Sequence, residues 1–142
     1  MLRLLAILIM MFSLKAYTSL SGIRLIIADN KEHPTERDVI NIVNGTMLKW
    51  GDGSNINLYI EDLNMIDAKS FSYKFNIAKD KFINDWRIKF FSGKASLPKQ
   101  VKNIEDSLSL IAEVNNSVLI LFSKADIPQE SLTKRGLKEV RF

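Results

Sequence analysis

Short apolar runs separated by helix-like stretches most constrain what this chain can fold into. Residues 23–28 and 118–122 are almost continuously apolar and rich in β-branched side chains, which predicts two buried strands. Residues 56–60 alternate apolar and polar side chains, which predicts a strand with one face more exposed than the other. Residues 137–142 follow Gly136 and predict a final strand at an edge of the sheet.

Amphipathic helices are predicted between these strands. Thr35 and Asp38 have the spacing of a capping box, and Gly45 is the predicted end of the helix that they begin. Further helices are predicted to begin at Asp67 or Ser70, at Lys79 and at Asn103. The helix over residues 79–91 is expected to align four apolar side chains on one side, those of Phe82, Ile83, Trp86 and Phe90. Residues 92–102 are predicted to form a loop.

The alternation of strands and helices predicts one domain of the α/β class. Helical crossovers favour parallel neighbours, so we expect a mixed, mostly parallel sheet flanked by helices. In such sheets ligands usually bind at the carboxyl ends of the strands, near helix N-termini.

The N-terminal segment has the plan of a secretory signal peptide. Arg3 precedes an apolar run over residues 4–14, which is shorter than the roughly 20 residues that span a bilayer. We predict a signal peptide over residues 1–21, with cleavage before Gly22 or, in the alternative, before Ser19. An uncleaved anchor is the other interpretation. Residues 22–142 are then expected to be periplasmic and to lack a membrane span.

The composition excludes several classes of function. The chain has 20 basic and 16 acidic residues with alternating signs, which indicates a solvated surface rather than a nucleic-acid interface. It has no cysteine, which excludes disulfides, thiolate catalysis and cysteine-based zinc sites. No nucleophile–base pair is apparent, so we predict a protein that is not an enzyme and uses no cofactor.

Several short motifs occur in a characteristic order. A predicted helix is followed by Trp-Gly-Asp-Gly at residues 50–53 and by the strand at residues 56–60. The downstream motif positions are Trp86, residues 91–94 (Phe-Ser-Gly-Lys), Pro98 and Val101. This order, over nearly all of residues 23–142, resembles that of short phosphate-type substrate-binding proteins of ABC importers. The resemblance implies a periplasmic-binding-protein-like fold in a short single-domain version.

The resemblance also implies a function. It points to an exported solute-binding protein for phosphate or a related small anion, which serves a membrane transporter or a receptor that senses the solute. The two loops that hold the anion in larger members correspond here to residues 29–34 and 61–67. Neither is glycine-rich or contains arginine, and the second carries three acids that would repel phosphate. The alternative is therefore a periplasmic interaction or adaptor protein that keeps the fold but has lost the anion pocket.

Six residues are candidate anion ligands. Lys31, His33 and Thr35 follow the first strand; Ser70 and Ser72 lie at a predicted helix start, and Lys94 is beside Gly93. Backbone amides at helix starts, hydroxyls and cations are suitable donors to an oxyanion. A plainer interpretation makes them solvated loop side chains and helix caps, which is the commoner role of such residues.

A metal site around the single histidine, which would make the chain a metal-dependent enzyme, is a weaker alternative. Asp29, Glu32, His33 and Glu36 are close in sequence. One histidine with nearby carboxylates is a poor zinc signature, because zinc sites typically use more histidine or cysteine ligands. We therefore predict no metal.

Overall fold

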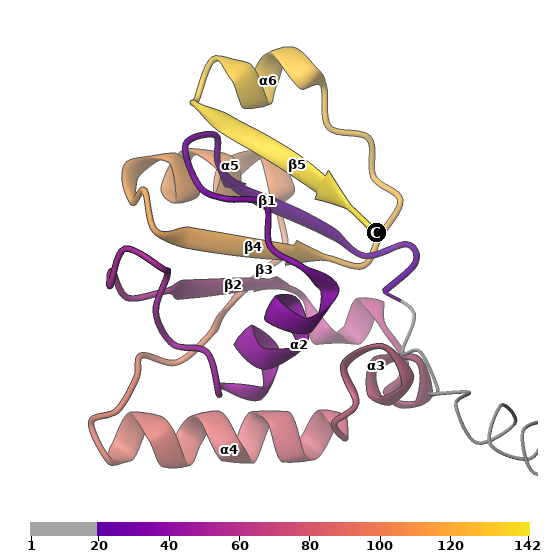
Figure 1. The fold of residues 1–142 in the computed structure, drawn as a ribbon. Coiled ribbons are helices and arrows are strands. Elements are labelled where there is room, and N and C mark those ends of the chain that lie inside the picture. The colour runs from indigo at the N-terminus through magenta and orange to yellow at the C-terminus, as the bar shows by residue number, and fades with distance from the viewer. Residues whose placement is uncertain (1–19) are drawn as a thin grey trace, which may run out of the picture.

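A single five-stranded sheet organises the molecule, in the order β3-β2-β4-β1-β5 (Figure 1). The computed structural model describes residues 20–142. The strands are β1 (Arg24–Ala28), β2 (Asn57–Glu61), β3 (Lys99–Val101), β4 (Ser117–Leu121) and β5 (Leu137–Arg141). The two buried strands predicted from residues 23–28 and 118–122 are neighbours in this sheet, as β1 and β4.

Four of the five strands run in the same direction. β2 is parallel to β3 and to β4, whereas β1 is antiparallel to both of its neighbours, β4 and β5. The prediction of a mixed, mostly parallel sheet is therefore confirmed. Arg24 pairs with Leu121 on one side and with Arg141 on the other. The first residue of β1 thus lies between the last residues of β4 and β5.

Helices cover both faces of the sheet (Figure 1). One face carries α2 (Glu36–Asn44), α3 (Ala68–Phe75) and α4 (Lys79–Phe91), and the other carries α5 (Ile104–Glu113) and α6 (Gln129–Thr133). Phe71 and Trp86 belong to the apolar cluster of the first face, and Leu108 and Ile111 to that of the second. Burial on both faces explains why β1 after Arg24 and β4 after Ser117 are apolar.

The helix starts predicted from the sequence are confirmed. Asp38 N donates to Thr35 Oγ1 at 3.1 Å, and Thr35 N donates to Asp38 Oδ2 at 2.8 Å, which completes the capping box of α2. Gly45 ends this helix with a φ of 71°, a left-handed conformation that glycine adopts without steric cost. Asp67 and Asn103 cap α3 and α5 in the same way as Thr35 caps α2.

Some expectations about individual elements are wrong. The strand at residues 56–60 has no exposed face, because β2 is central and Tyr59 is covered by the α5 layer. Residues 92–102 include the short edge strand β3 as well as a loop. Phe90 is 46% exposed, so the apolar side of α4 ends at Trp86. The helix α6, of five residues, was not predicted.

The packed domain includes a residue that the predicted signal peptide would remove. The signal-peptide prediction otherwise lies outside the described residues. Leu20 has an exposed fraction of 0% and belongs to the main apolar cluster. Ile23 N donates to Leu20 O at 2.8 Å, and Lys74 Nζ donates to Ser21 O at 2.6 Å. From residue 20 onward, no helix has the length and apolar character needed to cross a membrane.

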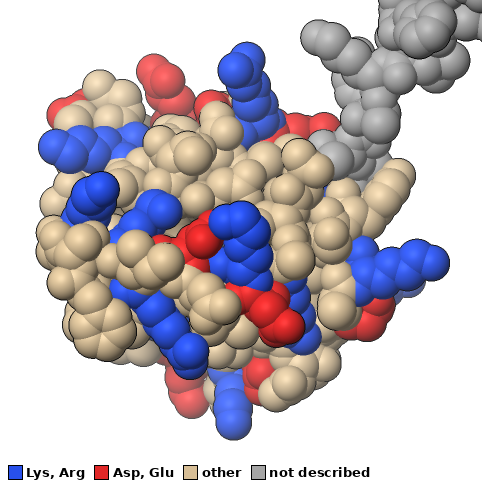
Figure 2. Space-filling model, turned by 90° about the horizontal axis from the view of Figure 1, so that it is seen from below, with Lys and Arg blue, Asp and Glu red and all other residues tan. Residues whose placement is uncertain are grey.

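The α4 face bears charges of both signs. Figure 2 views the molecule from this side and shows Lys and Arg side chains interspersed with Asp and Glu side chains. Lys81 Nζ and Asp85 Oδ2, which lie one turn apart on α4, are 2.6 Å apart. This pattern agrees with the solvated surface predicted from the alternating charges of the sequence.

Candidate functional site

A cavity opens at the edge of the sheet where the four parallel strands end. Its volume is about 460 Å³, and its lining consists of Gly22, Ile23, Arg24, Ser123, Lys124, Asp126, Arg141 and Phe142. These residues come from the start of β1, from the segment after β4 and from the end of β5. We call it the carboxyl-edge cavity. This is the place where ligands usually bind in open α/β sheets.

Arg24 organises the wall of this cavity. Its side chain is buried. β1 runs between β4 and β5, and its first residue lies between the last residues of these two strands. Nη1 donates to Glu139 Oε1 at 3.0 Å, and Nη2 donates to the carbonyl oxygens of Ser123 at 2.9 Å and Ala125 at 2.6 Å. The guanidinium thus fixes the segment after β4 against β5.

Cations and carboxylates both surround the cavity. Glu139 accepts from Arg24 through Oε1 and from Arg141 Nε through Oε2, the latter at 2.7 Å. The three cations in the lining, Arg24, Lys124 and Arg141, face two carboxylates, Asp126 in the lining and Glu139 beside it. Glu61, which accepts from Ser123 N at 2.9 Å, adds a third carboxylate beside the lining, so cations and carboxylates are equal in number around this cavity.

Two buried polar atoms at this cavity lack a hydrogen-bond partner among the described residues. They are Arg24 Nε and Ser123 Oγ, and both residues line the cavity. Buried polar groups are nearly always hydrogen-bonded, and an exception usually marks a bound water or ligand. Within the described residues, one N–H of Arg24 and the hydroxyl of Ser123 thus have no partner, and both belong to residues of the cavity wall.

The backbone amides that follow β4 are already occupied. Glu61 is buried at the end of β2, and its Oε2 accepts from Phe122 N at 2.6 Å and from Ser123 N at 2.9 Å. Successive amides of this kind are what a bound anion would use. A carboxylate of the chain itself takes that position, so these two amides are not available to an anion in the carboxyl-edge cavity.

The comparisons with known proteins give one structural likeness. No family model matches the sequence, and no curated protein matches it. A solved structure described as an ABC-type phosphate transport receptor from Vibrio cholerae is similar, with 14% sequence identity and a TM-score of 0.42. The match covers 82% of this chain and 53% of the receptor, so the chain spans about half the receptor's length. At this level of similarity, the function must be argued from the geometry of the chain itself.

Lys31 is used within the fold. Its side chain is buried; Nζ donates to Asp52 Oδ2 at 2.8 Å and lies 5.4 Å from the centre of the Trp50 ring. Hydrogen bonds hold the pKa of Asp52 well below its usual range. The one from Lys31 contributes most, and those from Ser54 come next. Lys31 therefore fastens the loop after β1 to the turn at residues 50–53.

His33 shares a recess with Lys31, whereas Thr35 caps a helix. The recess has a volume of about 270 Å³. His33 is exposed, and its ring centre lies 6.4 Å from that of Phe142. The hydroxyl of Thr35 accepts from Asp38 N, as described above. Between residues 20 and 142 no group of three or more metal-binding side chains is gathered, so Asp29 and its acidic neighbours do not form a cluster around His33.

The other three predicted residues lie elsewhere. Ser70 Oγ donates to Asp67 Oδ2 at 2.7 Å, and this bond lowers the pKa of Asp67. Ser72 is exposed on α3, and Lys94 lines a separate recess of about 410 Å³ with Phe90. The structure therefore does not bring the six residues to one recess. Their roles in anion binding stay predictions.

The direction of β1 explains this separation. The loop after β1 and the loop after β2 leave the sheet at opposite ends of the strands, because β1 is antiparallel to β4 while β2 is parallel to it. The residues that line the carboxyl-edge cavity were missed for the same reason. One signal was present in the sequence, namely Arg24 within an otherwise apolar strand, since a buried arginine needs partners.

Proposed function

We propose that this chain is an exported protein that binds a small anion, such as phosphate or a related oxyanion, in the carboxyl-edge cavity. The two unpartnered buried atoms, Arg24 Nε and Ser123 Oγ, are the observation that carries the proposal. Hydrogen bonds from a guanidinium to an oxyanion are charge-assisted and roughly twice as strong as neutral ones. In this proposal the bound anion is delivered to a membrane transporter or to a receptor that senses it.

One observation favours a second candidate, an interaction protein without a solute. Glu61 occupies the amides of Phe122 and Ser123 with a carboxylate of the chain itself. A protein that had lost its anion site would stabilise the empty strand end in this way. The second candidate predicts that no small anion binds.

Thermal unfolding and calorimetry with added anions test the proposal. The purified protein is titrated with phosphate, sulfate and acetate at constant ionic strength, because salt alone changes surface electrostatics. A ligand of the native state at about 100 times Kd adds about 2.7 kcal/mol of stability and raises the Tm. An unchanged Tm and no heat of binding with all three anions would overturn the proposal and favour the interaction protein.

Variants of the cavity sharpen this test. Ser123→Ala removes a hydroxyl that has no partner in the described residues, so it breaks no internal hydrogen bond. Arg141→Gln removes an exposed cation from the lining. Each is expected to weaken anion binding about tenfold. Arg37→Gln is the matched control, because Arg37 is an exposed arginine of α2 outside this cavity, and it should bind like the wild type.

A further inference from the structure

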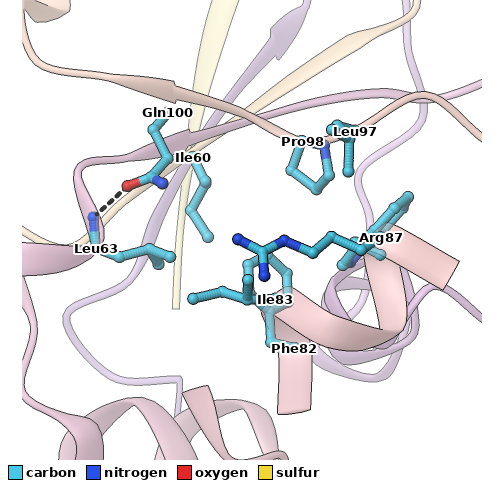
Figure 3. Close-up of a pocket in the computed structure, with 9 residues that line it drawn as sticks. Ile60, Leu63, Phe82, Ile83, Arg87, Leu97, Pro98 and Gln100 are labelled. Atoms are coloured by element: carbon cyan, nitrogen blue, oxygen red, sulfur yellow. Dashed lines mark hydrogen bonds between the residues drawn. The ribbon is translucent and has the colours of Figure 1, made fainter. Parts of the chain in front are cut away.

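A second cavity lies between α4 and the edge of the sheet formed by β2 and β3 (Figure 3). Its volume is about 170 Å³, and its lining consists of Ile60, Leu63, Phe82, Ile83, Trp86, Arg87, Leu97, Pro98 and Gln100. We call it the α4 cavity. It shares no lining residue with the carboxyl-edge cavity.

The floor of the α4 cavity is apolar. Ile60, Phe82 and Trp86 are all buried, and Trp86 is held in place because its Nε1 donates to Val43 O at 2.9 Å. Apolar cavities of about 150 Å³ take up one benzene molecule. The floor therefore suits an aromatic ring or a branched alkyl group of similar size.

The polar groups of the α4 cavity are donors. Arg87 extends from α4 into the space between Ile60 and Ile83 (Figure 3), and it forms no hydrogen bond or ion pair with the other described residues. Gln100 Oε1 accepts from Leu63 N at 3.1 Å, which orients the amide and leaves its NH₂ group free to donate. The lining contains no acidic side chain.

We infer that the α4 cavity binds a small monocarboxylate that carries an aromatic ring or a branched alkyl group. The ring or alkyl group fills the apolar floor, while the carboxylate accepts a bidentate pair of hydrogen bonds from Arg87 and one from Gln100. An apolar pocket with a few convergent polar groups is the usual form of a small-molecule site. This inference goes beyond the proposed function, since it concerns a different cavity and a different ligand class.

Benzoate is the probe that tests this inference. Binding is measured by calorimetry and by changes in the amide and indole N–H resonances of the ¹⁵N-labelled protein. Benzoate should shift the indole resonance of Trp86 and the side-chain amide of Gln100. Acetate, which lacks the ring, and benzyl alcohol, which lacks the charge, should each bind at least about tenfold more weakly. Equal binding of benzoate and benzyl alcohol, or no shift at Trp86, would overturn the inference.

Arg87→Gln separates this site from the carboxyl-edge cavity. Arg87 is exposed and has no partner in residues 20–142, so its replacement should leave the Tm unchanged. The variant should bind benzoate about tenfold more weakly and phosphate as the wild type does. Arg37→Gln should leave both affinities unchanged. If Arg87→Gln binds benzoate as well as the wild type does, this inference is contradicted and the proposed function is not affected. If Ser123→Ala weakens phosphate binding and leaves benzoate binding unchanged, the proposed function is supported independently of this inference.

Discussion

At the scale of single residues, the structure shows how buried charges are used. Lys31 and Arg24 are both buried, yet each donates to carboxylate or carbonyl oxygens of distant segments. The sequence made Lys31 a candidate anion ligand or a solvated loop side chain, because a lysine after a strand has the same appearance whether its partner is a solute, water or Asp52. The partner, 21 positions away, is fixed only by the fold.

The pair formed by Lys31 and Asp52 predicts a pH dependence of stability. The pKa of Asp52 is lowered from 3.8 in the folded state, so the folded protein holds the ionised carboxylate more strongly than the unfolded chain does. This contribution is present above pH 3.8 and is lost as the pH falls towards the folded pKa. Asp52→Asn should therefore destabilise the protein at pH 6, and its stability gap to the wild type should narrow below pH 3.8.

Urea unfolding at a series of pH values checks this prediction. Asp126→Asn is the control, because Asp126 is exposed and no ion pair involves it among the described residues. A stability gap for Asp52→Asn that stays constant between pH 6 and pH 3 would contradict the role assigned to Lys31.

At the scale of elements, the sequence predicts most of the secondary structure and a mostly parallel sheet, but not the direction of β1. The caps of α2, α3 and α5 are local, because each side chain bonds an amide three residues ahead, and such signals are readable in the sequence. The direction of β1 depends on pairing with β4 and β5, which lie far along the chain. A buried apolar strand has the same sequence pattern in either direction. The sequence therefore does not show which residues lie together at the carboxyl ends of the parallel strands.

The capping box of α2 gives a prediction at this scale. Thr35→Ala removes the acceptor of Asp38 N and should lower the free energy of unfolding by about 1 kcal/mol. Thr35→Ser keeps the hydroxyl and should stay close to the wild type. Chemical denaturation of the three proteins measures the difference. If both variants lose the same stability, the methyl group of Thr35 rather than its hydroxyl is responsible.

At the scale of the whole molecule, the core extends to the first described residue. Leu20 packs in the same apolar cluster as Ile23, Phe71 and Phe75, so the start of the domain is joined to β1 and α3 together. Of the two cleavage positions predicted from the sequence, the one before Gly22 would remove this buried leucine. Loss of a buried leucine side chain costs about 2–5 kcal/mol, a large part of a small domain's stability.

Of the two cleavage positions, the one before Ser19 is therefore the predicted one, and the alternative of an uncleaved anchor also retains Leu20. Mass spectrometry of the protein recovered from the periplasm should give a chain that begins at Ser19 and retains Leu20. Leu20→Ala, made in the same chain, should be about 2–5 kcal/mol less stable, because the surrounding apolar side chains lose their partner. Leu97→Ala is the control at an apolar side chain that is 40% exposed, and it should cost much less. A mature chain that begins at Gly22 and unfolds with the same free energy as the longer one would refute both the position and its physical reason.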